Sequence, residues 1–262
     1  MARAYQHNYS SIKPSVFDSE PRRRKALTIV KVCQHFLETQ DLSNLHLLDI
    51  GSSSGIIDDF LADHFGYVSG IDIDELAVEF AIEQFHKPNL SFARGDAMKL
   101  DHADTSVDVV VCSHVYEHVP DAAEMFAEIY RVLRPGGFCY FSGNNRVMFM
   151  EPHYRLPLLS LIPRPLAHLY MRLARKGGYY HEKHVSYWAL RKLCNTFHIV
   201  DYSAKVIADP EMFEVSYMLQ SDTLKWHAAN FIAQYMKWAT PHIWVLHKPG
   251  SALEAANAHR GS

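Results

Sequence analysis

The sequence predicts an α/β protein built on a doubly wound, mostly parallel seven-stranded sheet with helices on both faces. Three observations predict this fold. Short apolar runs and helical patterns alternate five times with short links, as in βαβ units. Residues 107–112 form a continuous Val-rich run, which is typical of a strand buried on both faces. The apolar run at 45–50 stops at a glycine turn, and helical spacing follows it at once.

The glycine turn is the stretch around which the other elements are arranged. Gly51 and Gly55 enclose three serines, and Ile57, Phe60 and Leu61 then recur at helical spacing. Neither glycine has a side chain that would keep a ligand away from the backbone. Ligands of parallel sheets bind beyond the carboxyl ends of the strands. We therefore expect this turn to form part of a binding crevice.

The remaining elements follow from the spacing of apolar residues, after polar and irregular residues 1–20. Strands are predicted over 67–73, 90–94, 138–141, 198–207 and 242–246, and helices over 21–39, 75–86, 121–133, 186–196 and 224–238. Asp121 and Glu124 form a capping box at the start of one helix. The basic run that begins at Arg22 is interpreted as a solvated first turn, with anion binding as the alternative.

Residues 144–184 break the alternation and contain four prolines, which predicts a lid insertion after the fifth strand. The predicted organisation is an N-terminal segment and helix at 1–44, one ligand-binding domain at 45–248 that includes the lid, and a disordered tail at 249–262.

Composition excludes several classes of protein. A net charge of −3 gives no broad basic surface for nucleic acid. The four cysteines form no close cluster, which fits reduced thiols in the cytoplasm better than disulfides or zinc. No secretory signal is visible, and no apolar run approaches the roughly 20 residues that span a bilayer.

The turn does not fit a phosphate-rich ligand. The dinucleotide fingerprint needs glycine where Ser53 stands, and no lysine follows Gly55 as in a phosphate-binding loop. Asp49, Asp72 and Asp96 each end a strand at the expected crevice. Carboxylates there would repel a pyrophosphate, but they could attract a cation and accept from hydroxyl or amino groups.

Five ordered motifs now carry a resemblance to a known family. They are Asp49-x-Gly51-x-x-x-Gly55, Gly70-Ile71-Asp72, Gly95-Asp96-Ala97, His114-Val115-Tyr116-Glu117-His118-Val119 and Leu133-Arg134-Pro135-Gly136-Gly137. The chain resembles a class I S-adenosylmethionine-dependent methyltransferase, most of all the small-molecule branch that includes quinone-biosynthesis enzymes. The resemblance covers about residues 45–143. It implies a Rossmann-like fold with S-adenosylmethionine as cofactor.

The cofactor residues that the resemblance implies are Asp49, Gly51, Ser53, Gly55, Asp72, Ile73, Asp96, Ala97, Ser113 and His114. Asp49 would lie near the methionine ammonium, Asp72 would accept from both ribose hydroxyls, and Asp96 from the adenine amino group. From the residues alone, Asp49 could instead cap the turn, Asp72 could be a surface acid and Asp96 a turn residue.

Methyl transfer to an oxygen is favoured, and it calls for in-line alignment, exclusion of water and a general base. Histidine is the usual base, and the candidates are His114, His153 and His181, with His184 beside them. His181 and His184 are three residues apart instead of the four of the metalloprotease motif, so no metal is expected.

Two segments remain for the acceptor, which is expected to be a small molecule or lipid-linked. Residues 156–176 mix leucines with arginines, which suits a lid helix or contact with a membrane surface. The aromatic stripe at 224–238 is interpreted as core, with an acceptor pocket as the alternative.

Two other functions compete with methyl transfer. A non-catalytic scaffold would keep this fold as a binding module, although the intact acids and glycines argue against a decayed pocket. An NAD-dependent oxidoreductase would need the missing third glycine. The acceptor and the oligomeric state stay open.

Overall fold

The computed structural model describes residues 9–12, 14–148 and 150–250 of the chain. Its centre is a seven-stranded sheet in the order β3-β2-β1-β4-β5-β9-β8. The strands are β1 (Leu42–Ile50), β2 (Phe65–Asp72), β3 (Leu90–Arg94), β4 (Val107–Ser113), β5 (Leu133–Gly143), β8 (His198–Asp201) and β9 (His242–His247). β9 is antiparallel to both β5 and β8, and the other six strands run in one direction, so the prediction of a mostly parallel doubly wound sheet is confirmed.

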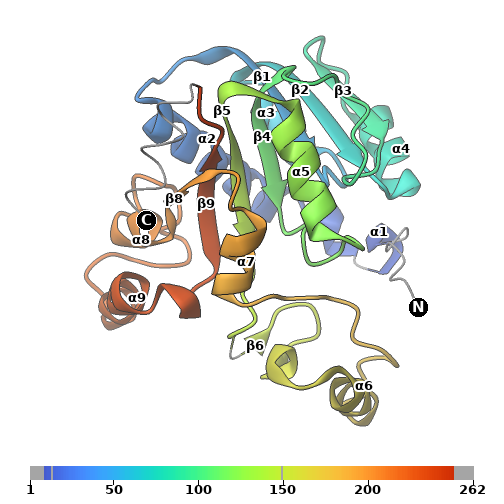
Figure 1. Ribbon diagram of the computed structural model, residues 1–262, viewed down its shortest axis with the longest axis vertical. Helices are drawn as coiled ribbons and strands as arrows, with labels where there is room; N and C mark the ends of the chain where they lie inside the picture. Colours follow the sequence, from blue (N-terminus) through green and yellow to red (C-terminus); the bar gives the residue numbers. More distant parts are fainter. Residues whose placement is uncertain (1–8, 13, 149, 251–262) are drawn as a thin grey trace.

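Helices cover both faces of the sheet (Figure 1). They are α2 (Ser19–Leu37), α3 (Ile56–Leu61), α4 (Glu75–Gln84), α5 (Ala122–Val132), α7 (Tyr187–Leu193), α8 (Ser203–Ala208) and α9 (Leu224–Tyr235). The Asp121 side chain caps α5 by accepting from the N–H groups of Ala123 and Glu124. The reciprocal half of the predicted capping box does not form, because the Asp121 N–H donates to Met98 Sδ at 3.3 Å instead of to Glu124. No helix of the described residues is long and apolar enough to cross a membrane.

Two apolar clusters hold the helices to the sheet. One joins α5 and α7 to one face through residues such as Phe126, Ile129 and Leu190. The other joins α2, α3 and α8 to the opposite face through residues such as Ile29 and Leu61. Because strands between these layers are buried on both faces, Val109 to Val111 in β4 are almost fully inaccessible.

The segment at 144–184, which the sequence predicts to be a lid, projects below the carboxyl end of the sheet (Figure 1) and is called the lid below. It contains the short pair β6 (Met150–Glu151) and β7 (Leu156–Pro157), a 3₁₀ turn η2 (Leu159–Leu161) and helix α6 (Arg164–Leu173). The lid has an apolar cluster of its own, which includes Leu156, Leu159 and Met171 and shares no residue with the two sheet clusters.

Three expectations are corrected. The strand expected over 198–207 ends at Asp201, whose side chain accepts from the Ser203 N–H in a turn just before α8. Residues 9–20 are not irregular, since they form α1 (Tyr9–Ile12), the 3₁₀ turn η1 (Pro14–Phe17) and the start of α2. The stripe at 224–238 is helical but exposed, so it is not core. The predicted tail lies outside the described residues from 251 onward.

Candidate active site

A cavity of about 530 Å³ lies where the strand order changes direction, between β1 and β4. This volume is in the range of small-molecule sites. Of the ten cofactor residues expected from the sequence, eight line it: Asp49, Gly51, Ser53, Asp72, Ile73, Ala97, Ser113 and His114. The carboxyl ends of four neighbouring strands therefore do converge on one crevice.

Gly55 and Asp96 do not line the cavity. A Cβ atom at Gly55 would come within 2.7 Å of the Phe92 ring and 2.8 Å of Ala81, so glycine here lets the turn pack against α4 and β3. The Asp96 side chain accepts from the Met98 N–H at 2.7 Å, as the turn interpretation expects.

Gly51 and Asp72 fix the shape of the turn. Gly51 has a φ of +82°, and a Cβ atom there would approach Val115 to 2.6 Å, so a larger residue would be strained and would clash. The Asp72 carboxylate accepts from the Ser53 N–H at 2.8 Å and from the Asp74 N–H at 2.9 Å. Asp72 thus ties the turn after β1 to the end of β2 while it lines the cavity.

An acidic cluster lies behind the turn. Burial raises the pKa of Asp49 well above its usual range, and the carboxylates of Asp58 and Asp72 add to this shift. Burial also raises the pKa of Asp58, on α3, to about 8. Sequence reasoning missed Asp58, because acids in a helical pattern are normally surface residues.

Replacing Asp58 with asparagine is expected to make the folded protein more stable at high pH. A carboxyl group with a folded pKa near 8 keeps its proton between about pH 4 and 8, whereas the unfolded chain releases it. Stability therefore falls as pH rises through this window. Asp58→Asn should remove much of this fall and add on the order of 1–3 kcal/mol to the free energy of unfolding at pH 8.

Urea unfolding from pH 5 to 9 measures the effect, with the exposed Asp101→Asn as control. Parallel pH curves for wild type and Asp58→Asn would contradict this expectation.

The N-terminal segment forms one wall of the cavity, which sequence reasoning also missed. Tyr9, Val16, Arg22 and Lys25 line it. The wall is attached to the sheet because the Asp74 carboxylate accepts from the Ser10 N–H at 2.7 Å. Arg22 and Lys25 belong to the basic run that begins α2. Its charge was the available signal, but which residues face inward depends on the tertiary fold.

Arg22 is suited to an anionic ligand group. Its Nε atom is buried and has no hydrogen-bond partner among the described residues. Burial lowers the pKa of Arg22, and the nearby carboxylate of Asp49 opposes that shift. The cavity therefore has a guanidinium group close to its acids, and could receive a ligand that carries both charges.

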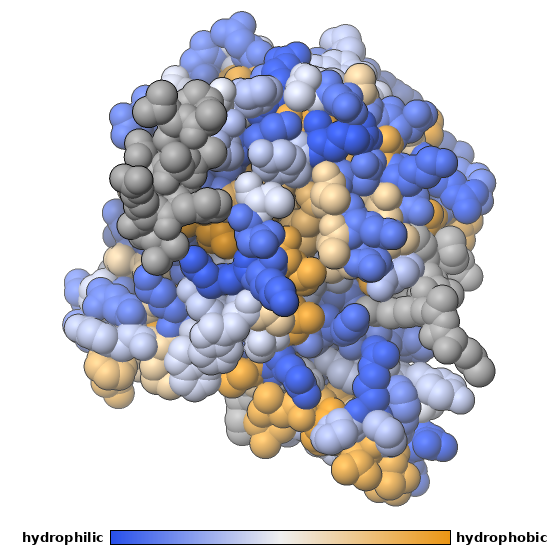
Figure 2. All heavy atoms as spheres, viewed as in Figure 1, coloured by the Kyte–Doolittle hydropathy of each residue, from blue (hydrophilic) through white to orange (hydrophobic). Residues whose placement is uncertain are grey.

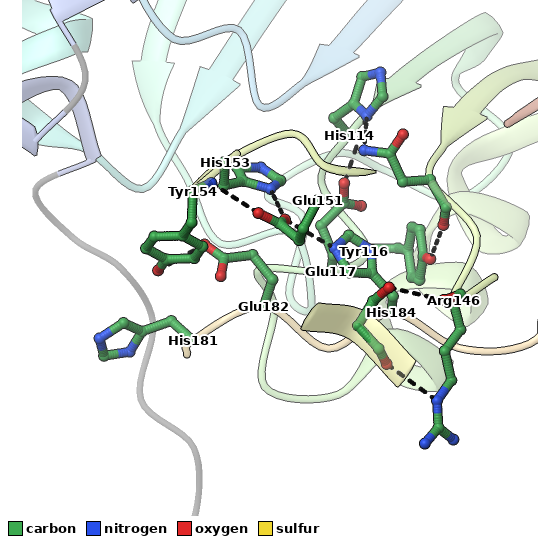
Figure 3. A network of polar contacts seen from close by, with 12 residues as sticks. His114, Tyr116, Glu117, Arg146, Glu151, His153, Tyr154, His181, Glu182 and His184 are labelled. Carbon is green, nitrogen blue, oxygen red and sulfur yellow. Dashed lines mark hydrogen bonds and ion pairs between the residues drawn. The ribbon is translucent and has the colours of Figure 1, made fainter. Parts of the chain in front are cut away.

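His114 lies directly after β4 and lines the cavity. Its φ of +58° is unusual for a residue with a side chain. Its Nδ1 lies 3.5 Å from the buried carboxylate of Glu117 and 3.3 Å from the Asn144 amide nitrogen (Figure 3). The Tyr116 hydroxyl donates to the Asn144 carbonyl. Glu117 and Asn144 therefore hold the imidazole ring in one orientation, with Nδ1 directed toward these two side chains.

The other histidines occupy different places. His153, from the lid, lines the cavity and contacts Glu151. His181 is exposed and does not line the cavity, so the structure does not bring it to the cofactor residues. His184 is buried beside Glu151 instead of pairing with His181 (Figure 3).

Comparison with known proteins supplies independent findings. Residues 48–141 match the family described as a methyltransferase domain. A ubiquinone biosynthesis O-methyltransferase of Hydrogenovibrio crunogenus is 31% identical over 153 residues, which are 56% of this chain and 58% of that protein. A protein of Mycolicibacterium smegmatis named a probable S-adenosylmethionine-dependent methyltransferase is 38% identical over 120 residues, 46% of each chain. The chain thus spans about half the length of the curated relatives it matches.

The fold extends beyond the aligned sequence. A chain in the solved complex of the Haloferax volcanii Trm112 methyltransferase activator with a methyltransferase has a TM-score of 0.57. The match covers 94% of this chain and 99% of that one, at 19% sequence identity. At this identity the likeness shows a shared fold alone.

Proposed function

We propose that the chain is a class I S-adenosylmethionine-dependent methyltransferase that methylates an oxygen atom of a small or lipid-linked acceptor. The observation that carries the proposal is the cavity at the switch point, where Asp49, Asp72 and Arg22 line one space. The ubiquinone-biosynthesis relative supports oxygen as the atom methylated.

The donors and acceptors of the cavity fit S-adenosylmethionine. The buried Nε of Arg22, without a partner among the described residues, can donate to the methionine carboxylate. Asp49 can face the ammonium, and Asp72 can accept from the ribose hydroxyls. When bound, this cofactor supplies a methyl group activated by a sulfonium. The chain's own residues then have to orient the acceptor, exclude water and take up a proton.

His114 is our choice of general base among the three histidines. The Glu117 carboxylate faces Nδ1 and can accept from its N–H, and in that tautomer Nε2 carries no proton and can accept one from an acceptor hydroxyl. The oxygen of that hydroxyl then forms the new bond to the methyl carbon, and the S–C electron pair stays on sulfur. Glu117 can stabilise the imidazolium, because hydrogen bonding and charge from His114 outweigh its burial and lower its pKa to about 2.

Calorimetric titration of the purified chain with S-adenosylhomocysteine tests the cofactor directly. We expect saturable binding of S-adenosylhomocysteine and none of NAD, because the turn lacks the dinucleotide glycines. If S-adenosylhomocysteine does not bind, the scaffold function becomes the better interpretation. If NAD binds instead, the oxidoreductase does.

The lid supports a lipid-linked acceptor and contact with an anionic membrane. Leu166, Leu169 and Leu173 lie along α6 and are 58%, 48% and 75% exposed. Figure 2 shows apolar side chains gathered at this end of the molecule. Residues 152–181 contain five arginines and lysines and no acid, so the charged neighbours of the exposed leucines along this segment are all basic. Apolar and basic side chains together suit a bilayer with anionic headgroups.

Flotation with liposomes that contain phosphatidylglycerol tests this contact. We expect the full chain to float, and Leu166→Glu with Leu169→Glu to abolish flotation, because the carboxylates would meet apolar and anionic lipid. The matched control is Leu76→Glu with Ile82→Glu, two exposed apolar residues on α4. Flotation of all three proteins alike, or of none, would remove the membrane from the proposal.

A further inference from the structure

A cluster of carboxylates and imidazoles lies where the lid segment meets the loop after β4, and Figure 3 labels Glu117, Glu151, His153 and His184 among its members. We call it the lid cluster, and it consists of Glu117, His118, Glu151, His153 and His184. Glu117 and His118 follow β4, whereas the other three belong to the lid segment. His118 and His153 also line the cavity, so the cluster adjoins the space expected to hold the acceptor.

Glu151 is the centre of the lid cluster and is fully buried. One carboxylate oxygen accepts from the Tyr154 N–H at 2.8 Å. The other lies 2.6 Å from Nδ1 of His153 and 3.5 Å from Nε2 of His184. A backbone donor thus orients the carboxylate, and two imidazoles converge on its second oxygen.

His184 is the least explained member of the lid cluster. Its side chain is 1% exposed. Neither of its ring nitrogens makes a hydrogen bond to any described residue, and Nε2 has only the 3.5 Å approach to Glu151. A buried imidazole without a hydrogen bond is costly, typically by about 1–3 kcal/mol. A ligand between His184 and Glu151 would remove this cost.

The charge of the region points to a cation. Glu117, Glu151 and Glu182 are all buried. The ion pairs that the described residues show for Glu151 go to His153 and His184, which carry charge only when protonated. Buried carboxylates need compensating charge, and neutral imidazoles cannot supply it. A divalent cation held by the same side chains can.

We propose that Glu151, His153 and His184 bind a divalent transition-metal ion, for which Zn²⁺ is the best chemical match. Their ligand atoms all lie within 4.8 Å of one another. Imidazole suits zinc, whereas magnesium prefers oxygen ligands alone. Two histidines and one glutamate form a known type of zinc ligand set, which leaves a fourth position open.

The distances suit this assignment. Zinc binds nitrogen and carboxylate oxygen at about 2.0–2.2 Å, so tetrahedral ligands lie roughly 3.3–3.5 Å apart. The His184–Glu151 distance of 3.5 Å already matches, while His153 would lengthen its 2.6 Å hydrogen bond by under about 1 Å. Tyr154 supplies the outer contact that orients the glutamate. The spacing of His181 and His184 predicts no metal, but His181 is not one of the three ligands proposed here.

The neighbours of the site suggest its role. Glu117, His118 and His153 form a second group of possible ligand atoms within 4.8 Å, and it shares His153 with the first. Of the proposed ligands, His153 lines the cavity, and an acceptor hydroxyl that reached the metal from there would lose its proton more readily. Metal binding itself does not depend on the proposed function.

Titration of the chelator-treated full chain with Co²⁺, followed by visible absorption, tests the site without an acceptor. We expect one Co²⁺ per chain with the spectrum of a low-coordinate ion, displaced by Zn²⁺, and a rise in melting temperature with Zn²⁺. His184→Asn and Glu151→Gln should each weaken binding at least tenfold. The matched control is His181→Asn, an exposed histidine in the same segment, which should bind as wild type does.

Two results would overturn the proposal. One is wild-type protein that binds no stoichiometric metal, a result that needs no variant. The other is wild-type affinity in both His184→Asn and Glu151→Gln, which would place the metal elsewhere. Binding of S-adenosylhomocysteine by each variant shows that the sheet remains folded, since neither residue lines the cavity. If the wild-type protein does not bind S-adenosylhomocysteine, that result counts against the proposed function, and the metal result is unaffected.

Discussion

His114→Asn is expected to lower turnover about 10²–10⁴-fold while affinity for S-adenosylhomocysteine changes little. The imidazole would take up the acceptor proton, and Glu117 would stabilise the resulting charge from 3.5 Å away. Asparagine cannot accept this proton at neutral pH. Single-turnover methyl transfer from labelled S-adenosylmethionine, with an acceptor that wild type methylates, measures the loss.

Asparagine is chosen here because of the backbone. His114 has a φ of +58°, and asparagine tolerates this region better than alanine does. A loss of turnover in His114→Asn then reports the missing imidazole and not a strained backbone. His181→Asn is the matched control, because this exposed histidine does not line the cavity. Full turnover in His114→Asn would move the base to another residue, with His153 as the next candidate.

Asp72→Ala is expected to weaken binding of S-adenosylhomocysteine by about 1–3 kcal/mol, or roughly 5–150-fold. Two contributions add. The carboxylate would lose its hydrogen bonds to the ribose hydroxyls, and the turn would lose the acceptor for the N–H groups of Ser53 and Asp74. Calorimetric titration measures the change.

A second variant separates the two contributions. The Ser53 and Asp74 N–H groups bond to different oxygens of Asp72, so Asp72→Asn can keep one of the two bonds, and its loss should lie between those of wild type and Asp72→Ala. Asp101→Ala, an exposed acid outside the cavity, should bind as wild type does. Equal affinity in all four proteins would exclude Asp72 from the cofactor site.

The sheet could be predicted because each strand has a local signal. The Val-rich run became β4, and the run at 90–94 became β3 with the expected ends. The strand at 198–207 was overestimated because the chain turns at Asp201, and the one side-chain hydrogen bond of that turn is not visible in apolar spacing. The stripe on α9 shows a further limit. Periodicity identifies the apolar face of a helix but not whether anything covers it.

The cofactor side of the site was also predictable in large part, because its acids and glycines stand at strand ends. Arg22, Asp58 and the N-terminal wall were missed, since their positions depend on contacts between distant segments. The lid cluster is the clearest example. Glu117, Glu151 and His184 are separated by more than 30 residues along the chain, so no local spacing could unite them.

The separate apolar cluster of the lid has a consequence for how such a protein can diversify. Leu156, Leu159 and Met171 pack among themselves and share no residue with the clusters that hold the sheet. Mutational effects at sites without shared partners are usually additive. Changes that reshape the lid can therefore accumulate without loosening the strands that carry Asp49 and Asp72. Selection could exchange one acceptor for another while the cofactor side stays the same.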